Sequence, residues 1–97
     1  MSELDKIKHA LRRNKSALKR QFKVKALGVF GSYVRGKQKK NSDVDILVEF
    51  SQTPGLFDYV RMENRLSDIL KKRVDLVMKG SLKPAIGKYI MREVVYV

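Results

Sequence analysis

The sequence predicts a small α/β (α+β) domain, with a mixed β-sheet of about four strands and helices mainly on one face. Two observations carry this prediction. Apolar residues recur at helical spacing in separate segments, and short runs rich in Val, Ile and Leu lie between those segments. Serine, glycine or proline stands at most of the boundaries. The elements alternate helix and strand throughout, and 97 residues suit one domain, so residues 1–97 are expected to form a single unit.

The first half of the chain is expected to hold two helices and two strands. Ser2 can cap the first helix, and Glu3 and Asp5 suit its first turn. An apolar stripe at helical spacing follows at Leu4, Ile7, Leu11, Leu18 and Phe22. The remaining elements are a strand at 24–30, a short helix at about 32–36 and a strand at 43–50, in which Val44, Ile46 and Val48 face the core.

The second half repeats this alternation. A turn at 53–55 precedes a helix over 56–71, and its stripe is Leu56, Tyr59, Met62, Leu66, Ile69 and Leu70. Lys71 and Lys72 stand where a glycine often ends a helix, so a left-handed stop is not expected there. A strand at 73–78 is followed by a helix that Ser81 caps, with Pro84 in its first turn, and by a strand at 93–97.

The composition favours anionic partners. The formal net charge is +12, from 22 basic and 10 acidic residues, and residues 1–25 carry nine Lys and Arg against two acids. Nucleotides, nucleic acid and acidic proteins all suit this balance, which does not choose among them. His9, the one histidine, lies in a charged helix and is expected at the surface, whereas Met62, Met78 and Met91 are expected in the core.

Three absences point to the cytoplasm. The chain has no cysteine, which excludes disulfides and thiolate metal sites, and it has no apolar run long enough to span a membrane. The first residues also lack the apolar segment of a signal peptide. A cytoplasmic location without membrane attachment is therefore expected.

Residues 31–48, GSYVRGKQKKNSDVDILV, combine two groups that suit phosphate chemistry. Gly31 lets the backbone approach a phosphate closely, and Ser32 can donate its hydroxyl and N–H. Asp43 and Asp45 lie two apart in a predicted strand, so their carboxylates share a face. Two such carboxylates can hold a pair of Mg²⁺ ions. The alternatives are a plain Ser-capped turn and two solvated carboxylates.

Two further residues are candidates for the same site. Asp75 alternates with Val74 and Leu76 and points away from their face, so it joins the other carboxylates if its strand lies beside theirs. Three clustered carboxylates repel one another and need cations to balance them. Arg35 can either bind a triphosphate or anchor the short helix to an acidic neighbour. No histidine or glutamate near the motif suggests a separate general base, so Asp75 is the candidate for that role.

This pattern resembles the signature of the polymerase-beta-like nucleotidyltransferase superfamily, in which a Gly-Ser pair precedes an Asp-X-Asp pair and a third carboxylate on a later strand. The resemblance is closest to the minimal nucleotidyltransferase family. It implies that fold, catalytic and metal-binding roles for Asp43, Asp45 and Asp75, and nucleotide contacts from Gly31, Ser32 and Arg35. It also implies two Mg²⁺ ions and ATP as the nucleotide substrate.

The same resemblance implies an antitoxin that transfers AMP from ATP to a hydroxyl, often of a tyrosine, on a HEPN-domain toxin. Larger members hold the acceptor with a second domain, and 97 residues leave no room for one, so a partner is expected to present it. Two alternatives remain from the residues themselves. One is a non-catalytic module that neutralises a toxin by binding. The other is a nucleic-acid binder that uses the basic first helix, although no nucleic-acid-reading motif supports it.

Overall fold

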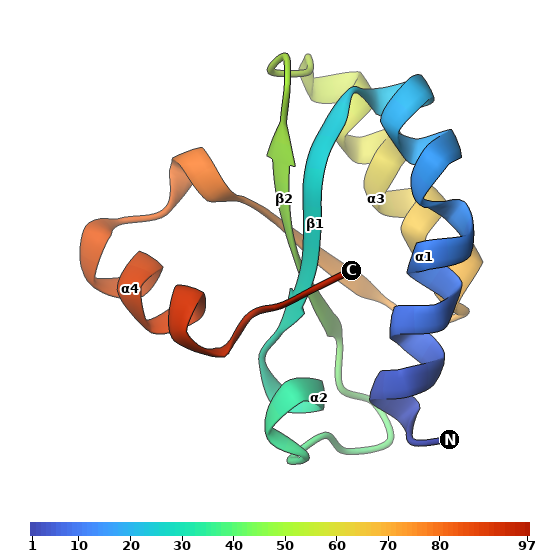
Figure 1. The fold of residues 1–97 in the computed structure, drawn as a ribbon, viewed down its shortest axis with the longest axis vertical. Coiled ribbons are helices and arrows are strands. Elements are labelled where there is room, and N and C mark those ends of the chain that lie inside the picture. Colours follow the sequence, from blue (N-terminus) through green and yellow to red (C-terminus); the bar gives the residue numbers. More distant parts are fainter.

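A computed structural model describes residues 1–97 and contains the helices and strands in the expected alternating order (Figure 1). The elements are α1 (Glu3–Phe22), β1 (Val24–Phe30), α2 (Ser32–Arg35), β2 (Val44–Phe50), α3 (Leu56–Leu70), β3 (Val74–Met78), α4 (Pro84–Glu93) and β4 (Val95–Tyr96). A short 3₁₀ turn, Lys79–Ser81, precedes α4.

The four strands form one mixed sheet in the order β3-β2-β1-β4. β1 runs antiparallel to β2 and to β4, whereas β2 and β3 are parallel. In the parallel pair Val44 lies opposite Val74 and Asp45 opposite Asp75. The predicted fold class is therefore confirmed, and the register already places two candidate carboxylates side by side.

The core lies between the sheet and two helices, α1 and α3, that cover the same face (Figure 1). The Ser2 side chain accepts a hydrogen bond from the Asp5 N–H and caps α1 as predicted. The buried stripes of α1 and α3 pack on the alternate residues of β1, β2 and β3 that face them. This cluster contains Ile7, Leu11, Leu18, Phe22, Val24, Leu27, Val29, Tyr33, Val44, Ile46, Val48, Met62, Leu66, Val74 and Leu76.

Three expectations about the helices are wrong. Leu56 is 75% exposed, because at 100° per residue it lies about 120° around α3 from the buried Met62. Lys71 does adopt the left-handed conformation, with φ 55° and ψ 37°, and ends α3 although it carries a Cβ. Ser81 caps nothing. It ends the 3₁₀ turn, and α4 begins at Pro84 without a side-chain cap.

The other face of the sheet carries Asp45 and Asp75, because each alternates with core residues of its strand. α4 lies on this side of the sheet, opposite α1 and α3 (Figure 1). Leu47 and Ile90 are buried but lie outside the main core cluster. Gly28 in β1 lets the segment between α4 and β4 pack closely on this strand, because a Cβ at position 28 would lie 2.7 Å from Val94 Cγ2. Met91 is 39% exposed, so its expected core role is wrong.

The remaining surface features are simple. His9 is exposed, as predicted. None of the helices is both long enough and apolar enough to cross a lipid bilayer.

Candidate nucleotidyl-transfer site

The candidate site forms at one end of the sheet, where β1 ends and β2 and β3 begin. Phe30, the last residue of β1, lies opposite Asp45 in β2, and Asp45 lies opposite Asp75 in β3. Gly31 follows β1 directly and opens the turn into α2. The fold therefore brings the Gly-Ser turn and two carboxylates together from three different segments.

Gly31 fits this position because two constraints exclude other residues. Its backbone has φ 82° and ψ −153°, a conformation that residues with a Cβ rarely adopt. A Cβ built there would also lie 2.0 Å from Asp45 Oδ2. The turn thus passes directly over the Asp45 carboxylate, and only a glycine leaves room for it.

The carboxylates differ in exposure. Asp45 is half-buried, whereas Asp75 and Asp43 are exposed. Burial first, and the like charges of Asp75 and Asp43 second, together raise the pKa of Asp45 from 3.8 to about 6. Two neighbouring carboxylates therefore disfavour the ionised form of Asp45, and a bound cation would relieve this repulsion.

The three carboxylates do not converge as a ready-made metal cluster. Asp43 lies just before β2, and its Oδ1 is 3.2 Å from Arg73 Nε. The Arg73 and Asp43 side chains are 81% and 48% exposed, and ion pairs of this kind contribute only about 0–1 kcal/mol. The all-oxygen donor set fits a hard divalent cation, and freeing Asp43 from Arg73 costs little.

Glu93 is the site residue that lies outside the motif found in the sequence. The Gly31 N–H donates to Glu93 Oε2 at 2.6 Å, and Arg35 Nη1 lies 2.9 and 3.0 Å from the two Glu93 oxygens. This contact raises the pKa of Arg35. Of the two roles considered for Arg35, the structure shows the anchor to an acidic neighbour. Glu93 reaches the motif because the end of α4, 62 residues after Gly31, folds back onto it.

One sequence signal does mark Glu93. An acidic residue in the last turn of a helix meets the negative end of the helix dipole, which is unfavourable without a cationic partner. Such a residue therefore points to a contact elsewhere in the fold. Its partner could not be identified from the sequence, because the pairing depends on where α4 lies.

Two serines complete the turn. Ser32 is the first residue of α2, and its carbonyl accepts the N–H groups of Gly36 and Lys37. The Ser42 hydroxyl accepts the Lys39 N–H at 2.7 Å and closes the basic loop just before β2. These bonds fix both ends of the loop that separates the Gly-Ser turn from the Asp-X-Asp pair.

The edge strand that carries Asp75 is held by α3. The Tyr59 hydroxyl donates to the Leu76 carbonyl, and a Glu63 oxygen accepts the Leu76 N–H at 3.0 Å. Burial raises the pKa of Tyr59, with smaller contributions from Glu63 and Asp75. The Leu76 N–H and carbonyl on the outer edge of β3 thereby have hydrogen-bond partners. These bonds hold the strand next to Asp75 in place beside β2.

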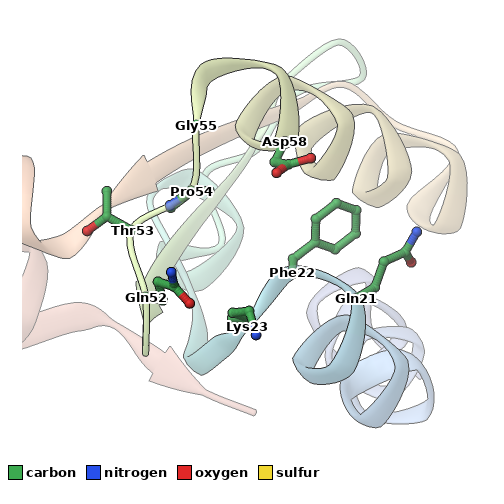
Figure 2. A pocket seen from close by; sticks show the side chains of 8 residues that line it. All are labelled: Gln21, Phe22, Lys23, Gln52, Thr53, Pro54, Gly55 and Asp58. Atoms are coloured by element: carbon green, nitrogen blue, oxygen red, sulfur yellow. The ribbon is translucent and has the colours of Figure 1, made fainter.

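The hollow drawn in Figure 2 belongs to a different part of the molecule. It has a volume of about 240 Å³ and is lined by Gln21, Phe22, Lys23, Gln52, Thr53, Pro54, Gly55 and Asp58. These residues lie at the end of the sheet where Val24 pairs with Phe50, opposite the end that carries Asp45. The hollow therefore does not contribute to the carboxylate site.

Comparison with known proteins agrees with this geometry. Residues 11–97 match the nucleotidyltransferase domain family. The chain is 50% identical, over 97 residues, to the protein adenylyltransferase MntA of Thermococcus cleftensis, and the match covers 100% of this chain and 98% of that protein. This chain belongs to the minimal nucleotidyltransferase family. The resemblance drawn from Gly31, Ser32, Asp43 and Asp45 is thereby confirmed.

Two solved structures share the fold of this nucleotidyltransferase. One, described as a minimal nucleotidyltransferase, has a TM-score of 0.79 and 30% identity, over 98% of this chain and 95% of that one. The other, a toxin–antitoxin structure with AMP-PNP, has a TM-score of 0.71 and 28% identity, over 99% of this chain and 72% of that one. A relative from Methanocaldococcus jannaschii, also assigned by name to the protein adenylyltransferases, is 46% identical over 98 residues.

Proposed function

We propose that this nucleotidyltransferase transfers AMP from ATP to a hydroxyl of a partner protein, a HEPN-type toxin, and so acts as its antitoxin. The names of the relatives from Thermococcus and Methanocaldococcus support a protein acceptor. The toxin–antitoxin structure with AMP-PNP supports both an adenine nucleotide and a toxin partner. The HEPN class rests on the family resemblance, and the cytoplasmic location stays a prediction.

One observation carries the proposal. Asp45 and Asp75 lie in register on adjacent strands, Asp45 lies against the Gly31 turn, and the Gly31 N–H of that turn donates to a carboxylate, that of Glu93. A hydrogen-bond donor that suits a phosphate and a pair of carboxylates therefore lie within one site. Nucleotidyl transfer needs both, because the triphosphate must be bound and its charge offset while the α-phosphorus is attacked.

We assign Mg²⁺, as two ions, to Asp43, Asp45 and Asp75. When bound, the ions would offset phosphate charge and lower the pKa of the attacking hydroxyl. The oxygen-only donor set supports this assignment, as does the raised pKa of Asp45, which burial and then the like charges of Asp75 and Asp43 produce.

The protein's own residues bind the phosphates and accept the proton of the attacking hydroxyl. Gly31 and Ser32 bind the phosphates through N–H and hydroxyl groups, and Arg35 adds a guanidinium on the same side. The acceptor oxygen attacks the α-phosphorus, a new P–O bond forms, and the bond to pyrophosphate breaks. Asp75 is exposed beside Asp45 and is placed to take the hydroxyl proton.

The partner supplies orientation. Asp43 and Asp75 are both exposed, so this face does not enclose an acceptor. In-line attack gains much of its rate from holding the hydroxyl against the α-phosphorus. The isolated chain should therefore bind ATP but transfer AMP poorly to water or to itself.

The test is intact-mass and peptide mass spectrometry of the chain co-expressed with its HEPN-type partner. We expect AMP on a tyrosine hydroxyl of the partner, and its loss when Asp43 and Asp45 are both changed to Asn. Asp68→Asn, an exposed acid on α3, is the matched control and should leave the modification intact.

An unmodified partner that wild type and the double variant inhibit equally would favour the non-catalytic binding module. Binding of nucleic acid by the basic α1 remains the third alternative. A salt-dependent mobility shift in the absence of nucleotide would support it.

A further inference from the structure

Glu93 occupies the two groups that the proposed function reserves for phosphate. Its carboxylate accepts the Gly31 N–H at 2.6 Å and contacts Arg35 Nη1 at 2.9 and 3.0 Å. The Glu93 side chain is 15% exposed and the Arg35 side chain is 44% exposed, so the carboxylate is sheltered while the guanidinium stays open to solvent. The chain therefore holds an anion of its own where a nucleotide phosphate would bind.

The contact and a bound phosphate compete for the same donors. The Gly31 N–H has a single hydrogen, which already points to Glu93 Oε2. Arg35 uses the same nitrogen, Nη1, for both Glu93 oxygens. A triphosphate placed on this turn would also meet the Glu93 charge, and like charges at this distance repel. Nucleotide binding therefore requires the Glu93 carboxylate to move away.

The segment that carries Glu93 is held by few interactions. α4 buries only Ile90. The chain after it is held to β1 through Val95 and Tyr96 and by a hydrogen bond from the Val97 N–H to the Leu27 carbonyl, and Lys15 Nζ donates to the Val97 carbonyl. Ile86 and Tyr89 on α4 are 53% and 60% exposed. Elements with few buried apolar contacts open at low free-energy cost, so movement of this segment is compatible with an intact core.

From these contacts we propose that Glu93 is an internal competitor that sets the affinity of the nucleotide site, and that the triphosphate binds by displacing it. The proposal rests on the proposed function, because it takes Gly31 and Arg35 to be phosphate contacts. In the closed state Glu93 stabilises the end of α4. In the open state the carboxylate leaves, and its negative charge no longer adds to that of Asp45 and Asp75.

The test compares ATP binding with Mg²⁺ by calorimetry in wild type, Glu93→Gln and Glu93→Asp. Apparent affinity falls with the fraction of competent molecules, so a closed state populated about nine-tenths of the time predicts binding about tenfold tighter in Glu93→Gln. Glu93→Asp keeps the charge but shortens its reach and should also bind more tightly. Glu49→Gln is the matched control on the distant part of β2 and should bind as wild type.

A second readout separates competition from a structural role. Glu93→Gln should lower the melting temperature of the nucleotide-free protein while it raises nucleotide affinity. In wild type, ATP should speed amide hydrogen exchange in residues 84–97, because the closing contact is lost. A purely structural role would lower stability and affinity together.

The outcomes are distinguishable. If wild type binds ATP with Mg²⁺ and both Glu93 variants bind it equally well or more weakly, the inference is overturned and the proposed function still stands. No Mg²⁺-dependent ATP binding in wild type or in either variant would overturn both.

Discussion

Replacing Asp45 by Asn should stabilise the metal-free protein against unfolding. The gain should be absent at acidic pH and should appear as the pH rises toward neutrality. The Asp45 carboxylate is half-buried, and its pKa rises from 3.8 to about 6 through burial first and through Asp75 and Asp43 second. An acid with a raised folded-state pKa binds its proton more tightly in the folded chain than in the unfolded one. Ionising Asp45 therefore costs stability, and Asn removes that cost.

The sign and size follow from the two pKa values. Below pH 3.8 both states hold the proton, and Asp45 contributes nothing. Between 3.8 and about 6 only the folded state keeps it, so stability falls as the pH rises. Above this window the full cost is about 3 kcal/mol at 1.36 kcal/mol per pKa unit. Because Asp45 is in part exposed, solvent screening reduces this to about 1–2 kcal/mol.

The assay is urea unfolding in EDTA at a series of pH values from about 4 to 8. Asp45→Asn should exceed wild type by about 1–2 kcal/mol at pH 8, and the difference should shrink toward zero near pH 4. Asp68→Asn, which removes the same charge from the exposed surface of α3, should show no such trend. A pH-independent difference, or a less stable Asp45→Asn at pH 8, would refute the reasoning.

The same variant reports on the metal. Adding Mg²⁺ should raise the unfolding free energy of wild type, because the cation binds the folded state and offsets the carboxylate repulsion. The rise should be much smaller in Asp45→Asn. Equal effects of Mg²⁺ on both proteins would contradict the assignment of Asp45 as a ligand.

Three further outcomes are expected. Gly31→Ala should destabilise the fold by about 1–3 kcal/mol in urea and abolish ATP binding by calorimetry, because its Cβ would meet Asp45 Oδ2 in a backbone conformation that disfavours side chains; a neutral effect would mean that the turn is misplaced. Leu66→Ala should cost about 2–5 kcal/mol in the same unfolding assay, because Leu66 is fully buried in the core; a loss under 1 kcal/mol would contradict that packing. Charge reversal at Arg12 and Arg13, both exposed on α1, should leave the affinity for ATP with Mg²⁺ within about twofold of wild type. The same change should weaken association with acidic partners at low salt. A collapse of ATP binding would place α1 in the site.

Local chemistry made most elements predictable. The Ser2 cap, the apolar stripe of α1 and the position of Pro84 at the start of α4 all follow from short-range rules. The local misses also have local causes. Leu56 lies away from the buried stripe because of the helical spacing. Lys71 adopts a left-handed conformation, which costs about 1 kcal/mol, because α3 has to end before β3 begins.

By itself the sequence determined the fold class, the family and the identity of the candidate site residues other than Glu93, because periodicity and motif spacing are properties of neighbouring residues. Only the tertiary structure decided how those residues meet. The parallel register of β2 and β3 sets Asp45 opposite Asp75, and the return of α4 sets Glu93 on Gly31 and Arg35. Contacts between segments this far apart depend on packing of the whole chain, and no local pattern in the sequence encodes them.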